Sequence, residues 1–459
     1  MLRIKDSLAQ YWKTLSESWR YAILAFLVLR LFYALWSSTI LAIQPLAVQN
    51  IDLSGEPVLT IFNLQDSQAY AYRREVQGQR LTFRAAQAKT VTDQQTGSIW
   101  DISTGSAVAG QLEGLKLSPS KTPTSKIFPY NQIDPYPVGW LAVWQRFDVN
   151  WYLSIAENGY GKVVGDIHFP PLYPMLIRFL TPIFGEAFLA GLFVSHVAAL
   201  YAIKLLYDTF VEWGGNLLAK RTVFLILIFP TSFFLFSAYT ESVFLVTVLL
   251  SLRYMRKRSW LWGGFWAFCA ILTRLQGAAL IVPLIYSIWQ DRPALRKLTH
   301  WVSLGLPTLG GLLYLYLRSR QVSSQVLPLV ESELHTRMVP PWQSYWYGIQ
   351  TLLSNQSSYI DILNLVVATF FIVLLVTGWQ RIPTEYSLFA AFSLLIMLSR
   401  ITETQPLSGM SRFALTLFPS FFVLGLITQR PWLQRLINYA FLILNLYLSA
   451  QFFSWGWVA

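Results

Sequence analysis

Long runs of apolar residues, separated by short polar segments, make up most of this chain. Examples are LIVPLIYSIW, LNLVVATFFIVLLVTGW and YAFLILNLYLSAQFF. About 20 predominantly apolar residues are enough for a helix to cross a bilayer. On this basis the pattern predicts about eleven membrane-spanning helices, at residues 21–43, 186–211, 221–236, 241–256, 259–275, 277–290, 299–317, 358–378, 384–399, 411–428 and 434–454.

One apolar segment is too irregular to be counted as a span. Residues 171–185, PLYPMLIRFLTPIFG, contain three prolines and Arg178 within a short stretch. A segment of this length and composition fits a helix at the membrane interface, or a half-membrane helix, better than a span.

The apolar pattern stops between residues 44 and 139. Here PVLTIFNL, AYAYRREV and RLTFRAAQAKTVT alternate and are rich in β-forming residues, with Gly, Asp, Gln and Ser between them. The pattern predicts a small β-rich domain inserted after the first span. Within it, DQQTGSIWDISTGSAVAG resembles a motif of an uncharacterised bacterial domain family, and a glycine-punctuated β-hairpin accounts for it equally well.

Composition and charge support an integral membrane protein. Only 13% of the residues are charged and 54% are hydrophobic, whereas soluble domains are about 25% charged. The net charge of +12 comes largely from Lys and Arg in short loops beside the apolar runs, a positive-inside pattern that gives no reason to expect nucleic-acid binding. The chain has one cysteine, Cys269, so no disulfide can form within it.

The charge pattern also predicts the topology and the division of the chain. Basic residues before the first span place the N-terminus in the cytoplasm and the following loop on the extracytoplasmic side. The expected parts are the N-terminus with the first helix (1–43), the β-rich extracytoplasmic insert (44–139), a first loop with interfacial helices (140–185), central membrane helices (186–317), a second extracytoplasmic loop (318–357) and C-terminal membrane helices (358–459).

The first loop contains the stretch WQRFDVNWYLSIAENGYG. Trp140, Trp144, Phe147 and Trp151 recur at helical spacing, which predicts an amphipathic helix lying along the outer membrane surface. Asp148 lies in the middle of this helix. From spacing alone it is either a functional carboxylate or a solvated or capping residue.

Four segments, taken in order, resemble the PIG-V family of membrane mannosyltransferases. The first has the pattern W-x-x-x-D-x-x-x-Y-L-x-I-A-x-x-G-Y followed by F-P-x-L-Y-P, and it includes Asp148 and Tyr152. Family members often have Trp directly before the Asp, where this chain has Phe147. The others are PTSFFLFSAYTESVFL, TRLQGAALIVPL and the weaker MSRFALTLFP.

The resemblance implies a fold and a chemistry. The fold is an all-α polytopic membrane protein of the GT-C glycosyltransferase class, here with the β-rich insert added. The implied reaction moves a sugar, mannose in that family, from a polyprenyl-phosphate-linked donor to an extracytoplasmic lipid or glycan acceptor, with inversion at the anomeric carbon. Asp148 then matches the general base. We expect an integral membrane location, in a bacterial inner membrane, or in the endoplasmic reticulum if the protein is eukaryotic.

Further residues are candidates for binding the donor or the acceptor. A lipid phosphate needs cationic partners, and Arg274, Arg400 and Arg412 are expected near the outer ends of their spans. Tyr239 and Glu241 belong to the second motif, although Glu241 also fits a carboxylate that simply meets a helix dipole. His168 lies in the first-loop motif and is either structural or ligand-binding. Arg30, in the first span, is expected either to pair with an acid such as Glu241 or to contact the donor phosphate.

Two alternatives remain open. Glu331, Glu333, His335 and Arg337 form a loop cluster that could hold a divalent metal, but solvated loop charges explain it more simply, so no cofactor is assigned. A lipid or glycolipid transporter would also be polytopic. Such a protein typically has paired repeats and polar residues at mid-membrane, and neither is evident here.

Overall fold

The computed structural model describes residues 12–53, 55–64, 68–87, 89–120, 133–134, 136, 139–161, 165–291, 298–321, 336–354, 357–402 and 406–458. The chain divides into two compact units. Unit 1 comprises residues 1–30, 155–448 and 458–459, and unit 2 comprises residues 31–154 and 449–457. Each unit is described by itself.

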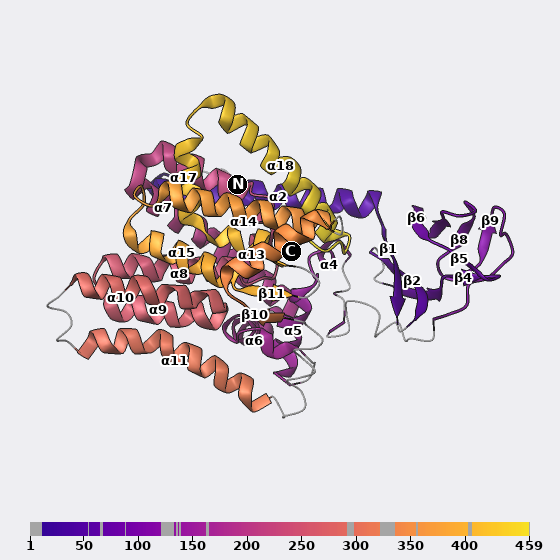
Figure 1. The fold of residues 1–459 in the computed structure, drawn as a ribbon, viewed down its shortest axis with the longest axis horizontal. Helices are drawn as coiled ribbons and strands as arrows, with labels where there is room; N and C mark the ends of the chain where they lie inside the picture. The colour runs from indigo at the N-terminus through magenta and orange to yellow at the C-terminus, as the bar shows by residue number, and fades with distance from the viewer. Residues whose placement is uncertain are drawn as a thin grey trace, which may run out of the picture. The chain divides into compact units, whose positions relative to one another are not determined.

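Unit 1 is helical, and its apolar helices run side by side (Figure 1). The longer helices that lie wholly or partly in it are α2 (Glu17–Ile43), α6 (Leu172–Phe184), α7 (Ala187–Leu227), α8 (Glu241–Arg256), α9 (Trp260–Thr273), α10 (Ile281–Gln290), α11 (Leu298–Gln321), α13 (Pro341–Leu353), α14 (Tyr359–Gly378), α15 (Thr384–Leu398), α17 (Phe418–Ile427) and α18 (Pro431–Phe453). Short elements join them: the 3₁₀ turns η1 (Asp166–His168), η2 (Ser232–Phe236), η3 (Leu275–Leu280) and η5 (Ala414–Thr416), the helix α16 (Met410–Phe413), and the paired strands β10 (Thr336–Met338) and β11 (Arg400–Thr402).

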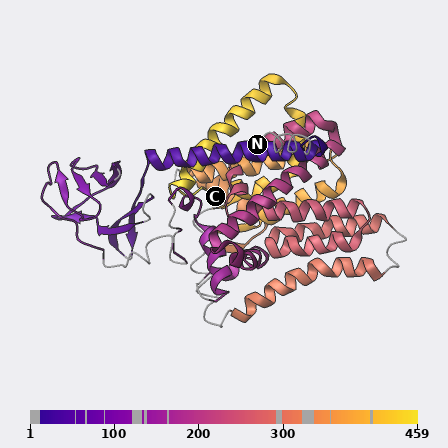
Figure 2. The same cartoon turned by 180° about the vertical axis from the view of Figure 1, so that it is seen from behind.

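The positions of the predicted spans agree well with these helices, while the count of about eleven spans stays a prediction. Four described helices are long and apolar enough to cross a membrane, namely α2, α7, α14 and α18, and a fifth span is possible if the bent pair 410–416 and 418–427 counts as one. The count differs because other apolar runs are interrupted. For example, the predicted spans 186–211 and 221–236 mostly correspond to the two helical parts of α7, which a kink with non-helical backbone at Gly215 separates. By contrast, α2 runs without a break, as its indigo ribbon shows in Figure 2.

Small residues allow the helices of unit 1 to approach closely. A Cβ atom at Gly264 of α9 would lie 2.3 Å from the carbonyl oxygen of Ser303 on α11. A Cβ at Gly310 of α11 would lie 3.1 Å from the Phe268 ring of α9. Close backbone contact of this kind is typical of helix packing in membranes, where burying apolar surface gives little drive for helices to associate.

Unit 2 contains the predicted β-rich region. Its strands are β1 (Leu46–Leu53), β2 (Glu56–Asn63), β3 (Ala69–Arg73), β4 (Glu75–Val76), β5 (Gln79–Arg80), β6 (Phe83–Gln87), β7 (Thr90–Asp93), β8 (Ile99–Asp101) and β9 (Ala107–Ala109). They pair antiparallel in the orders β1-β2-β3, β4-β5 and β6-β7-β8-β9. Buried side chains including Leu59, Ile61 and Trp100 form the core, so the alternation seen in the sequence corresponds to a packed face.

Two turns of the β-rich region share the pattern D-x-x-T-G-S, a repeat that the sequence predictions did not include. The carboxylates of Asp93 and Asp101 accept hydrogen bonds from the backbone N–H groups of Thr96 and Thr104, at 2.6 and 2.9 Å. The glycine after each threonine has φ +70°, which glycine adopts without strain. These turns connect β7 to β8 and β8 to β9, so the glycine-punctuated hairpin is confirmed.

The predicted continuous helix across residues 140–155 is wrong. The chain forms a short helix α4 (Gly139–Ala142), breaks, and resumes as α5 (Asp148–Asn158). The break is at Phe147, whose φ of +50° is left-handed and incompatible with a helix. Trp144, predicted to face the membrane, is fully buried and packs edge-on against Phe453.

Candidate functional site

Three interruptions of the apolar helices bring the main polar residues of unit 1 together. Residues 228–240 separate α7 from α8, Arg274 separates α9 from η3, and residues 409–417 precede α17. A charged residue of a sequence motif goes with each interruption. Glu241 directly follows the first, Arg274 is the second, and Arg412 lies within the third. Non-helical backbone at membrane depth is tolerated where protein covers it, so these breaks are expected to be buried, as they are.

The three charged side chains form one buried cluster. Arg274 Nη1 donates a 2.6 Å hydrogen bond to Glu241 Oε1, and Arg412 Nε lies 3.3 Å from the same oxygen. The Glu241 side chain is 0% exposed, whereas those of Arg274 and Arg412 keep 9% and 12% of their surface. The arginines therefore lie on the more open side of the cluster, and the three residues together carry one net positive charge.

An aromatic ring holds the two arginines in place. The guanidinium of Arg274 lies 4.5 Å from the centre of the Phe413 ring, and that of Arg412 lies 4.9 Å from the same ring. Arg412 also lies 5.4 Å from the ring of Tyr239. Cation–π contacts fix the planes of the guanidinium groups and partly compensate for their loss of water. The role of Phe413 was not predicted, although it directly follows Arg412 in the motif SRF.

The third motif has a structural explanation. Arg274 adopts an extended conformation (φ −155°, ψ 140°) that ends α9, and η3 then folds back against the helix end. A Cβ at Gly277 would lie 2.4 Å from backbone atoms of Ala270 and Ile271, so only glycine fits there. Gln276, which lies between Arg274 and Gly277 in the chain, is buried. Neither its Oε1 nor its Nε2 has a hydrogen-bond partner among the described residues. Arg274 and Gln276 are thus held by the same tight turn.

The short helix α16 positions Arg412. It begins after Gly409, whose φ is +78°. The Ser411 N–H donates to Asn364 Oδ1 at 2.9 Å, and the Ser411 carbonyl accepts from the hydroxyl of Thr231 at 2.8 Å. The last bond joins the first and third interruptions directly, which explains how Arg412 comes to lie beside Glu241.

Tyr239 and Glu241 are positioned by the start of α8. The Tyr239 carbonyl accepts a 3.0 Å hydrogen bond from Ser195 on α7, and the Ser195 hydroxyl is 2.7 Å from the hydroxyl of Tyr173 on α6. Glu241 lies in the first turn of α8, where a carboxylate meets the positive end of the helix dipole. The dipole interaction considered for Glu241 is therefore present together with its arginine contacts.

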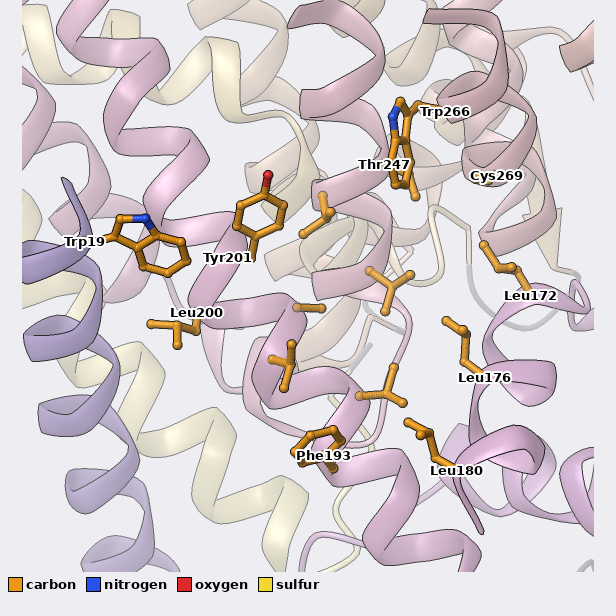
Figure 3. A pocket seen from close by; sticks show the side chains of 15 residues that line it. Trp19, Leu172, Leu176, Leu180, Phe193, Leu200, Tyr201, Thr247, Trp266 and Cys269 are labelled. Carbon is orange, nitrogen blue, oxygen red and sulfur yellow. The ribbon is translucent and has the colours of Figure 1, made fainter. Parts of the chain in front are cut away.

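An apolar groove of about 500 Å³ is lined by side chains of α2, α6, α7, α8 and α9 (Figure 3). Leu172, Leu176 and Leu180 of α6 form one wall, and side chains of α7, α8 and α9 together with Trp19 form the rest. The groove and the cluster share helices. Val243 of α8 lines the groove two residues after Glu241, and Cys269 of α9 lines it five residues before Arg274.

The other predicted residues belong to other helices, turns and strands. His168 ends η1, Arg30 lies in α2, and Arg400 is an exposed residue of β11 whose carbonyl accepts from the Ser344 hydroxyl. Asp148 and Tyr152 lie on α5 within unit 2, with Tyr152 buried. Their convergence with Glu241 and Arg274 stays a prediction.

Most of the candidate metal cluster lies outside the described residues. Glu331, Glu333 and His335 lie outside the described residues, and Arg337 belongs to β10. Across the part of the chain that is described, no group of three or more His, Cys, Asp or Glu side chains is placed to hold a metal ion.

Comparison with known proteins gives one distant structural likeness. No family model and no curated protein matches the chain, so the resemblance to the PIG-V family stays a prediction. Among solved structures, the crystal structure of ArnT from Cupriavidus metallidurans bound to undecaprenyl phosphate matches with a TM-score of 0.41 and 14% sequence identity. The match covers 60% of this chain and 53% of ArnT, so it spans about half the length of that protein.

Proposed function

We propose that this protein is an inverting membrane glycosyltransferase that takes its sugar from a polyprenyl-phosphate-linked donor. The PIG-V resemblance suggests mannose as the sugar and a lipid or glycan as the acceptor. The apolar runs of the sequence suggest about eleven membrane crossings, its charge pattern suggests an extracytoplasmic site, and the bacterial motif of the insert suggests a bacterial inner membrane. The shorter apolar helices α6, α9, α10 and α15 would supply some of the additional membrane segments.

One observation carries the proposal. Three segments of the sequence resembled the same family independently, and each contributes one charged residue to a single buried cluster: Glu241, Arg274 and Arg412. A chance resemblance gives no reason for these side chains to meet. Their meeting supports a shared role for the three motifs.

The cluster has the chemistry to bind a lipid phosphate. Arginine presents several N–H donors in a planar fork that matches phosphate oxygens. Glu241 is completely buried behind the two arginines, so it can orient them without itself meeting an anion. In the reaction, the bond between the anomeric carbon and the phosphate oxygen breaks and the phosphate takes the electron pair. Fixed positive charge at the phosphate stabilises this developing charge.

The groove suits the hydrocarbon part of such a donor. Its volume lies within the range of about 300–1,000 Å³ that is common for ligand pockets. Its walls are apolar, and two of its helices lead within a few residues to Glu241 and Arg274. We propose that an isoprenoid chain occupies the groove while its phosphate meets the arginines.

Asp148 is proposed as the general base. It accepts the proton of the acceptor hydroxyl as the hydroxyl oxygen attacks the anomeric carbon from the side opposite the leaving phosphate. Asp148 is only partly exposed and begins α5. Glu157 lies on the same helix but is exposed, which makes it a matched control.

A transfer assay tests the proposal. Purified protein in lipid nanodiscs is incubated with radiolabelled polyprenyl-phosphate-mannose and a panel of glycolipid and glycan acceptors. We expect transfer by the wild type and by Glu157→Gln, and a loss of about 100-fold or more in Asp148→Asn, in line with the removal of a general base. If Asp148→Asn transfers at the wild-type rate, Asp148 is not the base. If no polyprenyl-phosphate sugar serves as donor, the proposed function is wrong.

A further inference from the structure

The loop that leads into Asp148 is held by a segment from much later in the chain. Residues 143–147 join α4 to α5, and residues 452–457 pack against them within unit 2. We name Phe452, Phe453, Trp455 and Trp457 the aromatic clamp. Its two points of contact are Arg146 and Phe147, the two residues immediately before Asp148.

Arg146 is a fully buried cation at the centre of this contact. Its Nε and Nη2 both donate to the carbonyl oxygen of Phe453, at 3.2 and 3.1 Å, and its guanidinium lies 4.5 Å from the centre of the Trp455 ring. Its Nη1 donates to the carbonyl of Ala142 at 2.6 Å. Only 1% of Arg146 is exposed, although burying a charge is costly unless donors and acceptors are matched. The side chain therefore ties the clamp to the loop with several bonds at once.

Phe147 is held in an unfavourable conformation by the same clamp. Its φ of +50° is rare for a residue with a bulky side chain and strains the backbone. Its ring lies 6.0, 5.2 and 5.2 Å from the rings of Phe452, Trp455 and Trp457. Strain of this kind persists only where the surroundings determine the conformation. Because Phe147 directly precedes the first residue of α5, its backbone angles set the direction in which Asp148 leaves the loop.

We propose that Arg146 and the aromatic clamp position Asp148, so that Arg146 is a positioning residue for sugar transfer. This inference rests on the proposed function, in which Asp148 is the base. It predicts an effect on the chemical step rather than on donor binding, because a displaced base still allows the donor to bind.

Kinetics of two variants test the role in transfer. Arg146→Lys keeps the charge but cannot direct a planar fork at one carbonyl oxygen. Trp457→Leu removes one ring from Phe147 at a residue that is 39% exposed, so it should fold. We expect kcat to fall by about 10- to 100-fold in Arg146→Lys and less in Trp457→Leu, with the donor KM within about twofold of wild type. Arg178→Lys, at an exposed position of α6, is the control. Unchanged kcat in both variants would overturn the inference.

A second measurement does not depend on transfer. In a Cys269→Ala background, Asp148→Cys places a single thiol at the position of the base, and its rate of reaction with a maleimide is measured between pH 6 and 9. We expect adding Arg146→Lys to change the rate and its pH profile, and adding Arg178→Lys to leave both as they were. Identical profiles in all three proteins would show that the clamp does not hold position 148. Loss of transfer in Asp148→Asn with normal kcat in Arg146→Lys would refute the clamp and leave the proposed function standing. If Arg146→Lys changes the reactivity of the thiol but the wild type transfers no sugar, the clamp stands and the proposed function is refuted.

Discussion

Replacing Arg274 with Gln should weaken unit 1 through the loss of two interactions. The variant loses a charged hydrogen bond of 2.6 Å to fully buried Glu241, worth about 1.5–3 kcal/mol. It also loses the contact with the Phe413 ring at 4.5 Å, worth up to about 2 kcal/mol when desolvated. The sum, about 2–5 kcal/mol, overlaps the usual cost of about 3–5 kcal/mol for breaking a buried ion pair by removing one partner. Arg412→Gln should cost less, because Arg412 Nε is 3.3 Å from the same oxygen.

A double-mutant cycle separates this coupling from general damage. Glu241→Gln, Arg274→Gln and the double variant are unfolded reversibly in mixed micelles with increasing dodecyl sulfate, and helicity is followed by circular dichroism. The losses of unfolding free energy in the two single variants, added together, should exceed the loss in the double variant by about 1–3 kcal/mol, because Glu241 and Arg274 interact directly. Arg178→Gln, which is exposed on α6, should stay within about 0.5 kcal/mol of wild type. Additive losses, or an Arg274→Gln variant as stable as Arg178→Gln, would refute the assignment of a coupled buried cluster.

Three further predictions concern other parts of the chain. Burial alone would raise the pKa of Asp93, but hydrogen bonds from Trp100, Thr96 and Ser98 outweigh it and hold the pKa below its usual 3.8. The ionised carboxylate therefore stabilises the fold above pH 3.8, and this stabilisation is lost as the pH falls through the lower pKa of the folded protein. Compared with wild type at the same pH, Asp93→Asn should show faster hydrogen exchange of residues 90–109, and this difference should shrink below pH 3.8. A difference that grows on acidification would contradict the lowered pKa of Asp93. Gly264→Ala should destabilise the protein by about 1–3 kcal/mol in the dodecyl sulfate unfolding assay, because the added methyl group would lie 2.3 Å from the Ser303 carbonyl oxygen. Gly305→Ala, whose added methyl group would have no atom within 4 Å, should be neutral in the same assay. Equal effects of the two substitutions would rule out the close α9–α11 contact. Polyprenyl phosphate at ten times its Kd should slow modification of Cys269 by a lipophilic maleimide by about tenfold. An unchanged rate would mean that the isoprenoid chain does not occupy the groove.

The sequence predicted elements better than it predicted their interruptions. The range 241–256 was predicted for α8 and observed without change, because Glu241 and the basic residues near Arg256 mark its two ends. The length of α7 was not predicted, since an apolar run does not reveal that the helix continues past 211 and changes direction only at Gly215.

Contacts between distant segments were beyond sequence reasoning. Helical spacing put Trp144 and Phe147 on a membrane-facing helix. In the structure they lie in a bent loop, where Trp144 is buried against Phe453 and Phe147 is partly buried against Trp455. Glu241, Arg274 and Arg412 were each singled out by a motif, but no spacing rule could show that they share one carboxylate oxygen. Conversely, the D-x-x-T-G-S repeat could have been predicted, because its turn chemistry is local.

The central claim is a single displacement of a lipid phosphate by an acceptor hydroxyl. The anomeric configuration of the product, determined by NMR after transfer by the purified wild-type protein, tests it most directly. We predict a glycoside whose configuration is opposite to that of the polyprenyl-phosphate donor. A product that retains the configuration of the donor would contradict this reaction, because a single displacement from the side opposite the phosphate inverts the anomeric carbon.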